Sequence, residues 1–496
     1  MICVTLGRAR HKRMIADHQF LAEQGAQLVE LRLDYISRAV SLKRLLENRF
    51  CPIVVTVRRR EDGGRWLKSE AERLTLLRSA IAAGVDYVDI EADVASQIPR
   101  YGNTKRIISF HDFDETPEDL EELHAAMAEE DADIVKIATM ANSFQDNLRM
   151  MDLVKNAKIP TIGICMGEMG MITRILGERL GSPFTYATFS KDKKMAPGLL
   201  EWKEMQTLYR YSTIDDNTVL FGVVADPVAH SYSPLIHNRA FEDSGINARY
   251  LPFRVPKSDL PNFIKHCKEL GVEGLSVTIP HKEEALDQCT QAESSASGIG
   301  AVNTLVFQGD SVLGYNTDYR AAMDCVEELF NIDRTKERPM QGMTALILGA
   351  GGVSRAIAWG LKQRHCDVVI ASRTFERAEI LASELGCRVI KWEDRHDERI
   401  NLLVNGTPIG MHPDVDVSPY NETSLNQFVA VFDTVYNPEN TLLIKYAKRA
   451  QCRIITGIDM FVRQAAYQYK LFTGKDANVQ LMRKTIKDAT NPVQLN

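Results

Sequence analysis

The sequence lacks the features that mark several classes of protein. No run of apolar residues approaches the roughly 18 that cross a bilayer, and residues 1–6 lack the basic and long apolar regions of a signal peptide. The nine cysteines are scattered singly, without a CxxC pair or a His cluster at ligand spacing, so we expect no metal site and a reducing, cytoplasmic location. Lys+Arg number 60 against 66 Asp+Glu, and the net charge of -6 gives no basic surface for nucleic acid or anionic lipid. We therefore expect small-molecule partners, and neither nucleic acid nor membrane.

Length and composition indicate more than one globular domain. The chain has 496 residues, more than three times the roughly 150 residues of a typical domain. Its 45% hydrophobic and 25% charged residues lie near the globular average, which excludes collagen-like, low-complexity and wholly disordered chains. Two or three domains, each with a buried core, are expected.

The first 210 residues repeat a unit of one strand followed by one helix. Helical spacing is found between the apolar runs, for example over 70–83 and 118–129. Eight such units predict an α/β fold of the TIM (β/α)8 barrel type, with an open doubly wound sheet as the alternative. The predicted strands cover residues 3–6, 28–33, 53–57, 87–90, 106–110, 134–140, 161–165 and 185–189.

Charged residues occupy the carboxyl ends of these predicted strands, where a barrel has its active site. Alternation places Glu30, Arg32 and Asp34 on the strand face opposite to the leucines, so they point into the barrel. The other strand-end residues of this kind are Arg58, His111 and Lys136. After the seventh strand, Arg174 begins a helix at a position suited to bind a substrate carboxylate.

Lys136 leads to the most specific inference. An amine in a mostly apolar strand loses hydration, its pKa falls, and the neutral amine becomes a nucleophile toward carbonyl groups. We therefore predict a Schiff base at Lys136, with His111 as a general base beside it. Taken alone, Lys136 could instead extend to solvent and His111 could be a core or capping histidine.

These residues resemble type I 3-dehydroquinate dehydratase over nearly all of residues 1–210. The resemblance implies that Lys136 forms an imine with the substrate ketone, that His111 removes the C2 proton, and that Arg174 holds the carboxylate. It also implies that Glu30, Arg32 and Arg58 bind ring hydroxyls or order the site. The motifs that carry it are Glu30-x-Arg32, Arg58 before Gly63-Gly64, Phe110-His111-Asp112-Phe113, Lys136-Ile137-Ala138, Gly170-x-x-x-Arg174 and Ala196-Pro197-Gly198.

Three positions depart from that family pattern. Asp62 stands where the family has a Glu that supports the histidine, and its shorter side chain is expected to serve the same purpose. Met195 and Leu199 stand where the family pattern has Ser and Gln, which removes two polar substrate contacts. Weaker substrate binding or altered lid closure is the expected consequence.

The second half begins with a polar junction near residue 215 and a fresh strand over 219–225. Ser231 and Ser233 precede Pro234, so we expect Ser233 as an N-cap at a helix start that suits a carboxylate. Lys282 is expected to begin a helix, where a cation opposes the helix dipole. Asp318 follows another strand and would by default cap a helix.

A nucleotide-binding pattern follows. The predicted strand 344–348, a glycine-rich turn and the predicted helix 355–362 occur in the order of a dinucleotide fold. After the next strand, 368–371, two arginines replace the acid that would bind a ribose 2'-hydroxyl, which predicts NADP. The candidate cofactor residues are Gly349, Ala350, Gly351, Gly352, Val353, Ser372, Arg373, Thr374 and Arg377.

This half resembles shikimate dehydrogenase over roughly residues 218–485, on motifs that include Ser231-x-Ser233-Pro234, Val277-Thr278-x-Pro280-x-Lys282, Asn316-Thr317-Asp318 and Gly349-Ala350-Gly351-Gly352. The resemblance implies that Lys282 and Asp318 exchange a proton with the substrate oxygen while NADPH delivers hydride. It also implies that two serines bind the carboxylate and that the pocket is completed by other polar residues. This substrate-binding set is Ser231, Ser233, Thr278, Asn303, Tyr436 and Gln464.

Together the two resemblances imply one bifunctional enzyme that dehydrates 3-dehydroquinate to 3-dehydroshikimate and then reduces this product to shikimate. The implied divisions are a barrel over 1–215, a substrate domain over 216–330, a Rossmann NADP domain over 331–460, and C-terminal helices over 461–496 that return to the substrate domain. The alternatives are a dehydrogenase, acting on shikimate or quinate, whose barrel is weakly active or only a scaffold, and a non-catalytic ligand sensor.

Overall fold

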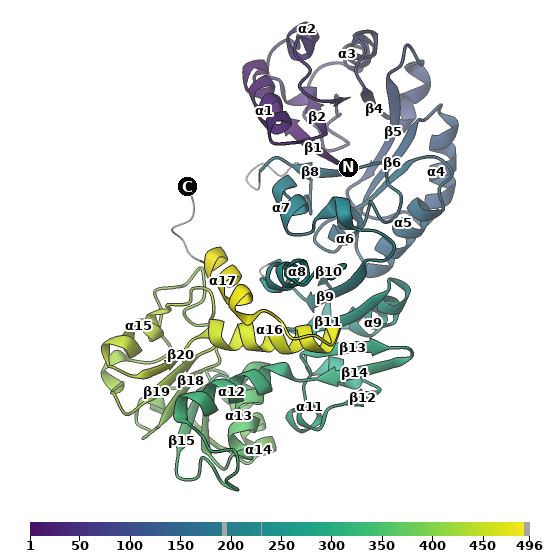
Figure 1. Ribbon diagram of the computed structural model, residues 1–496. Helices are drawn as coiled ribbons and strands as arrows, with labels where there is room; N and C mark the ends of the chain where they lie inside the picture. The colour runs from purple at the N-terminus through teal and green to yellow at the C-terminus, as the bar shows by residue number, and fades with distance from the viewer. Residues whose placement is uncertain (191–195, 230, 491–496) are drawn as a thin grey trace. The chain divides into compact units, whose positions relative to one another are not determined.

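The computed structural model describes residues 1–190, 196–229 and 231–490 of the chain (Figure 1). The chain forms two compact units. The first comprises Met1–Thr218 with Pro252–Val255, and the second comprises Val219–Leu251 with Pro256–Asn496. The polar junction near residue 215 therefore lies a few residues before the start of the second unit.

The first unit is an eight-stranded parallel barrel in the order β7-β6-β5-β4-β3-β2-β1-β8. In the described part of the chain no pairing joins β7 to β8, so the barrel is nearly closed. The prediction of an α/β barrel is confirmed, and the open doubly wound sheet is wrong. The strands are β1 Ile2–Gly7, β2 Leu28–Arg32, β3 Ile53–Thr56, β4 Tyr87–Glu91, β5 Lys105–Asp112, β6 Ile134–Met140, β7 Thr161–Met166 and β8 Thr185–Thr188.

Helices connect successive strands and cover the outside of the barrel, as parallel strands require (Figure 1). A capping box starts α3, in which the Ser69 side chain accepts from the backbone of Glu72 and the Glu72 carboxylate accepts in return. Before α4, the Thr116 hydroxyl contacts the Thr139 hydroxyl and the Met140 carbonyl. The helices of this unit are α1 His11–Glu23, α2 Leu42–Leu46, α3 Glu70–Ala82, α4 Leu120–Glu129, α5 Phe144–Asn156, α6 Met171–Ile175 and α7 Trp202–Thr207.

The barrel interior changes from apolar to charged along the strands. Apolar side chains such as Cys3, Leu28 and Ile107 belong to one buried cluster. Further along the same strands the paired positions are polar, as in the neighbours Ser109 and Lys136 on β5 and β6. Because alternate residues of a strand share one face, each strand carries both the apolar filling and a charged residue nearer its carboxyl end.

The second unit begins with a six-stranded sheet in the order β10-β9-β11-β13-β14-β12. Residues of α16 and α17, including Ile458, Tyr469 and Ile486, share one buried cluster with Phe221 of β9 and Ile236 of α8. The C-terminal helices therefore pack on this first sheet. The strands are β9 Val219–Ala225, β10 Ala248–Arg254, β11 Val272–Val277, β12 Gln291–Ala292, β13 Thr304–Gln308 and β14 Ser311–Tyr315.

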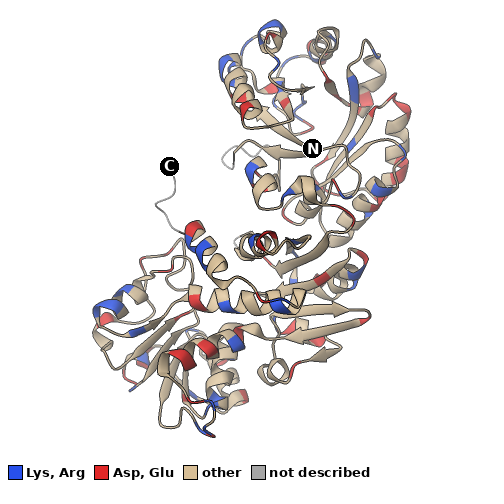
Figure 2. Ribbon diagram, in the orientation of Figure 1, with Lys and Arg blue, Asp and Glu red and all other residues tan. Residues whose placement is uncertain are grey.

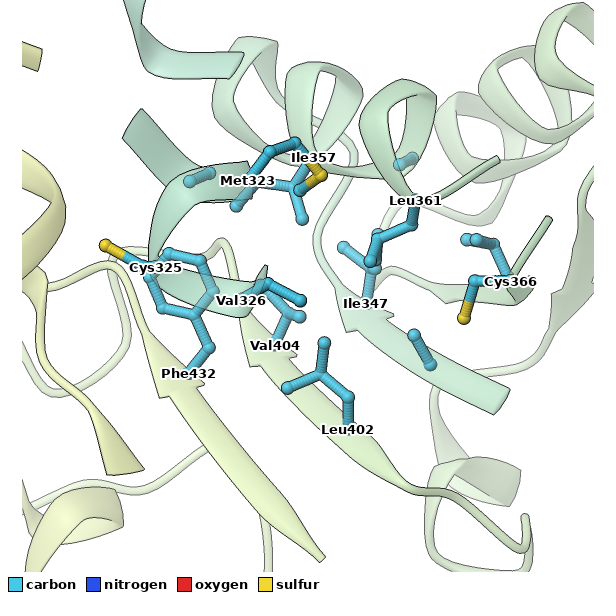
Figure 3. Packing of buried hydrophobic residues seen from close by; sticks show 14 of the residues in the cluster. Met323, Cys325, Val326, Ile347, Ile357, Leu361, Cys366, Leu402, Val404 and Phe432 are labelled. Atoms are coloured by element: carbon cyan, nitrogen blue, oxygen red, sulfur yellow. The ribbon is translucent and has the colours of Figure 1, made fainter. Parts of the chain in front are cut away.

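The other sheet of this unit is wholly parallel, in the order β17-β16-β15-β18-β19-β20. Its central strands pack on α12 and α13 through apolar side chains, among them Met323, Ile347, Ile357 and Phe432 (Figure 3). This core holds the start of α13 against the end of β15. The strands are β15 Thr344–Leu348, β16 Asp367–Ala371, β17 Arg388–Ile390, β18 Leu402–Asn405, β19 Ala430–Asp433 and β20 Arg453–Ile455.

Two predicted helix caps of this unit are wrong. Ser233 is the first residue of α8 rather than its cap. Asn316, not Asp318, caps α12 by accepting from the Tyr319 amide, so the Asp318 carboxylate is free for another partner. The helices are α8 Ser233–Asp243, α9 Leu260–Glu269, α10 Glu284–Asp287, α11 Ser294–Ile299, α12 Thr317–Phe330, α13 Gly352–Gln363, α14 Phe375–Leu385, α15 Leu442–Arg449, α16 Gly457–Thr473 and α17 Val479–Thr490.

Charges of both signs are spread over the helices of each unit, in keeping with the near balance of acidic and basic residues (Figure 2). Within residues 1–190, 196–229 and 231–490, no helix combines the length and the apolar character that a bilayer crossing requires. All nine cysteines are free thiols.

Candidate active sites

A cavity of about 70 Å³ lies within the barrel, at the carboxyl ends of its strands. All six residues predicted to catalyse or bind in this unit line it, although they come from different strands and from α6. The lining residues are Thr5, Glu30, Arg32, Arg58, Asp62, Gly63, His111, Phe113, Lys136, Ala138, Ile164, Met166, Arg174, Tyr186, Ala196 and Leu199.

Lys136 is buried in this cavity, with 6% of its surface exposed, so it does not extend to solvent. Its Nζ donates to Asp89 Oδ2 at 2.9 Å and lies 4.2 Å from the centre of the Tyr186 ring. The strand around it is apolar, as expected, but a carboxylate and an aromatic face contact the amine. Asp89 orients the amine, which can attack a carbonyl carbon once it has lost a proton.

Asp89 and Glu91 are functional residues that the sequence reasoning missed. Arg58 donates to Asp89 Oδ1 at 2.6 Å and to Glu91 Oε1 at 2.8 Å, and Arg73 donates to Glu91 Oε2 at 2.5 Å. Although burial opposes it, the Arg58 and Lys136 charges hold the pKa of Asp89 well below its usual range. The signal was present in Tyr87–Glu91, where alternation places both acids on one strand face, as it does in β2.

His111 is half-buried and Arg174 is buried, and each has one side-chain nitrogen that is buried. Burial, with the nearby Arg58 and Lys136 charges, holds the pKa of His111 well below its ordinary value, so the ring is a neutral base at pH 7. Burial also lowers the pKa of Arg174 to about 10. Within the described ranges, His111 Nδ1 and Arg174 Nε have no hydrogen-bond partner. A guanidinium with unused donors facing a cavity suits a substrate carboxylate.

Glu30 and Arg32, which also line the cavity, are held by hydrogen bonds to neighbouring side chains. Glu30 Oε1 accepts from the Thr56 hydroxyl at 2.7 Å. Arg32 forms a bidentate pair with Asp34, both distances being 2.9 Å. Asp34 lies in a 3-10 helix over Leu33–Tyr35 rather than on the strand, so its predicted place on the inner strand face is wrong.

The three departures from the family pattern have different outcomes. Asp62 lines the cavity but accepts from Arg59 at 2.7 Å, and in the described residues it makes no hydrogen bond to His111. Its predicted support of the histidine is therefore not found. Leu199 is buried and lines the cavity, which makes that wall apolar as expected. Met195 lies outside the described residues.

A second cavity, of about 400 Å³, lies in the second unit. Its walls come from the β9, β11 and α12 region on one side and from α13, the segment after β19 and α16 on the other. All predicted substrate-binding and catalytic residues of this half line it. The lining set includes Ser231, Ser233, Ser276, Thr278, Ile279, Lys282, Asn303, Asp318, Val353, Met411, Tyr436, Phe461, Gln464 and Gln468.

Lys282 and Asp318 face each other in this cavity, 2.5 Å apart between Nζ and Oδ2. Their side chains are 11% and 10% exposed. Lys282 precedes α10 by two residues, since that helix begins at Glu284, so the expected opposition to a helix dipole is wrong. An ammonium oriented by a carboxylate can donate a proton to an alkoxide as a ketone is reduced.

A hydrogen-bond network fixes the polar floor of this cavity. Asn303 accepts from the Thr317 amide at 2.8 Å and donates to the Thr317 hydroxyl at 2.9 Å, which ties the start of α12 to β13. Ser276 donates to Gln468 Oε1 at 2.8 Å. Ser276 and Gln468 line the cavity but were missed, because neither belongs to a helix start or a charged pair that the sequence makes visible.

The glycine-rich turn between β15 and α13 suits a dinucleotide. Gly349 has φ of +102°, in the region that favours glycine, and Gly351 begins α13 as its cap. A Cβ on Gly351 would meet no atom within 4 Å, so the helix start is open on that side. Backbone N–H groups at the start of a helix bind phosphate. The side chain of Ser354, at the third small position, is fully buried against Gly406.

The end of β16 suits a 2'-phosphate. Ser372, Arg373 and Thr374 follow the strand, and Arg377 lies in the first turn of α14. Arg373 and Arg377 are exposed, and in the part of the chain that the structure describes neither forms a salt bridge. Two unpaired guanidinium groups at this position, with no carboxylate, fit NADP rather than NAD.

The fold and sites define a two-part α/β enzyme: a barrel with a buried lysine in its cavity, and a dehydrogenase with a dinucleotide fold. Residues 2–216 match the family type I 3-dehydroquinase. Residues 223–305 match the shikimate dehydrogenase substrate binding domain, 332–401 match shikimate / quinate 5-dehydrogenase, and 457–487 match the shikimate 5'-dehydrogenase C-terminal domain.

Known proteins are similar to this chain, one of them over almost its whole length. A chloroplastic bifunctional 3-dehydroquinate dehydratase/shikimate dehydrogenase of Arabidopsis thaliana is 35% identical over 97% of this chain and 83% of its own length. A shikimate dehydrogenase (NADP(+)) of Methanocaldococcus jannaschii is 36% identical over 55% of this chain and 98% of its own length. A solved shikimate dehydrogenase in complex with NADP+ is 34% identical, with a TM-score of 0.52, and covers 56% of this chain and 98% of its own length.

The chain belongs to the family of bifunctional 3-dehydroquinate dehydratase/shikimate dehydrogenases. The predicted family, the pair of fused enzymes, the small-molecule substrates and the cofactor NADP are thereby confirmed. The roles of individual residues are inferences from the geometry and are taken up next.

Proposed function

We propose that the barrel dehydrates 3-dehydroquinate through an imine on Lys136, and that the second unit reduces the 3-dehydroshikimate so formed to shikimate. The observation that carries the proposal is the occurrence of two buried lysine–aspartate pairs, Lys136–Asp89 and Lys282–Asp318, each facing a cavity. One pair can release a nucleophilic amine, and the other can deliver a proton.

In the barrel, the Lys136 amine attacks the substrate ketone in its deprotonated form, and Asp89 orients it. The imine acidifies the neighbouring C–H, and the neutral His111 ring removes that proton. The leaving hydroxyl departs as water, and hydrolysis of the imine restores the amine. Arg174 binds the carboxylate, while Glu30, Arg32 and Arg58 contact ring hydroxyls or hold the neighbours that do.

In the second unit, Ser231 and Ser233 bind the substrate carboxylate. Thr278, Asn303, Tyr436 and Gln464 contact the ring, and all four line the same cavity. Lys282 donates a proton to the carbonyl oxygen during reduction, and Asp318 orients the ammonium. The Lys282 amine then takes up a proton from solvent.

NADPH, when bound, supplies the hydride for this reduction. Backbone N–H groups of the glycine-rich turn between β15 and α13 suit its pyrophosphate, and the side chains after β16 suit its 2'-phosphate. The residues that would hold the cofactor are Gly349, Ala350, Gly351, Gly352, Val353, Ser372, Arg373, Thr374 and Arg377.

Two finer assignments belong to the same proposal. The first is the division into a barrel (1–215), a substrate domain (216–330), an NADP domain (331–460) and returning helices (461–496). The second is that the protein is located in the cytoplasm. The nine free thiols favour this location because they suit a reducing compartment. Tagged protein found only in another compartment would contradict the second assignment.

The test is to give the purified protein 3-dehydroquinate and NADPH, and to follow enone formation and NADPH consumption separately. We expect both signals, and borohydride should trap one substrate-derived adduct on Lys136. A protein that oxidises shikimate but neither dehydrates 3-dehydroquinate nor forms the adduct has a scaffold barrel. Faster oxidation of quinate than of shikimate would contradict shikimate as the product of the second unit.

A further inference from the structure

Tyr186 is a cavity residue that the proposed mechanism does not use. It lies on β8, opposite Cys3 of β1, and its side chain lines the barrel cavity. Its ring covers the Lys136 amine, with 4.2 Å between Nζ and the ring centre. The edge contact with Phe184, whose ring centre is 5.6 Å away, fixes its orientation. The ring alone would exclude water from the amine, which phenylalanine could do equally well.

The phenol hydroxyl needs a separate explanation. It is buried, and within residues 1–190, 196–229 and 231–490 it has no hydrogen-bond partner. A buried hydroxyl without a partner is destabilising, so it is retained where it serves a ligand. Burial, followed by the Glu30 carboxylate, raises the pKa of Tyr186 well above its ordinary value. The hydroxyl therefore keeps its proton and is a hydrogen-bond donor.

Two hydroxyls near the amine already have partners. Ser109 donates to Asp89 at 2.6 Å, and Thr56 donates to Glu30 at 2.7 Å. The wall that contains Leu199 is apolar. The Tyr186 hydroxyl is an unused donor on the residue whose ring covers Nζ, so an oxygen on the carbon that bonds to Nζ can accept from it.

We propose that the Tyr186 hydroxyl donates a hydrogen bond to the oxygen on the substrate carbon that Lys136 attacks. This inference rests on the proposed dehydratase function. When Nζ adds to the carbonyl carbon, the C–N bond forms and the electron pair of the C=O bond moves to this oxygen. The oxygen takes up the two protons that the amine loses and leaves as water, while Tyr186 keeps its own proton. The bond stabilises the charge that develops on the oxygen.

The experiment compares the whole chain with its Tyr186→Phe variant, which keeps the ring and removes only the hydroxyl. The rate at which borohydride captures the Lys136 adduct in a single turnover, and the steady-state kcat and KM of dehydration, are measured for both. We expect imine formation and dehydratase kcat/KM to fall about ten-fold, the effect of losing one hydrogen bond. Tyr87→Phe is the matched control, since Tyr87 contacts the same Phe184 but does not line the cavity.

The shikimate dehydrogenase activity of the same samples reports whether the chain is folded, and it should be unchanged. A Tyr186→Phe variant that forms the adduct at the wild-type rate overturns the inference, whether or not later steps are slower. Wild-type protein that forms no adduct contradicts the proposed function instead, so the two failures are distinguishable.

Discussion

The two sites use the same pair of residue types in different surroundings. Lys136 meets Asp89 in a cavity of about 70 Å³, where Arg58 adds a second cation to the same carboxylate. Lys282 meets Asp318 in a cavity of about 400 Å³ that is also bounded by α13 of the dinucleotide fold. The lysine that we propose as the nucleophile is enclosed with a network that balances its charge. The lysine that we propose as the proton donor lines a larger cavity, with room for substrate beside a cofactor.

The largest expected effect is the separation of the two activities. Lys136→Ala should reduce dehydration by about 10⁴-fold or more, because the covalent nucleophile is lost. Lys282→Ala should reduce ketone reduction by roughly 10²–10⁴-fold, because a general acid is lost. Each variant is assayed for both reactions, and the other activity serves as the control. Loss of both activities from either change would contradict two independent sites.

The carboxylates of the two pairs should differ in their effect on stability. Asp89→Asn leaves Lys136 buried without its anion and leaves Arg58 with Glu91 alone, and should lower the free energy of unfolding by about 3–5 kcal/mol. Asp318→Asn removes a partner at the edge of a larger cavity and should cost about 1 kcal/mol, while reducing ketone reduction about 10²-fold. Denaturant unfolding measures the first effect and steady-state kinetics the second. Equal losses of stability would show that the surroundings of the two pairs are alike.

The proposed contact between the second unit and the 2'-phosphate of NADPH is tested at Arg373. Arg373→Ala should raise KM for NADPH about ten-fold, which corresponds to about 1.4 kcal/mol, and should change KM for NADH much less. Arg399→Ala is the matched control, because this exposed arginine precedes β18, at the opposite end of the strands from the glycine-rich turn. An equal change for both cofactors would mean that Arg373 does not contact the 2'-phosphate.

The smallest expected effect is a pH dependence of stability in the second unit. Burial lowers the pKa of His237 to about 3. Above pH 6.5 the ring is neutral in both the folded and unfolded chain. Between pH 6.5 and about 3 only the unfolded chain takes up the proton, so the free energy of unfolding should fall by about 1.4 kcal/mol per pH unit from this residue.

His237→Phe should weaken this acid sensitivity, and it keeps a ring to stack on Tyr250, whose centre is 4.4 Å away. Unfolding of the variant and the wild type at pH 7 and pH 5.5 gives the difference, with the exposed His412→Phe as control. An unchanged pH dependence would mean that His237 is protonated in the folded chain.

Local patterns in the sequence were enough to locate most of the fold. Parallel strands alternate with helices over the barrel, and the predicted strand over 134–140 agrees with β6 at both ends. Helix caps were harder to predict from the sequence. Asn and Asp are both good caps, and only the path of the chain selects Asn316 over Asp318. The same ambiguity led to the wrong prediction that Ser233 caps α8.

By itself the sequence determined which side chains face inward at the strand ends, because alternation along a strand is a property of the backbone. It also determined the turn at Gly349, where the positive φ favours glycine, and the arginines that distinguish NADP. Which charges meet depended on folding: Asp89 lies 47 residues from Lys136 along the chain, and Asp62 pairs with Arg59 rather than with His111. Such partners are selected by the closure and register of the sheet, which bring distant strands together and which no local pattern encodes.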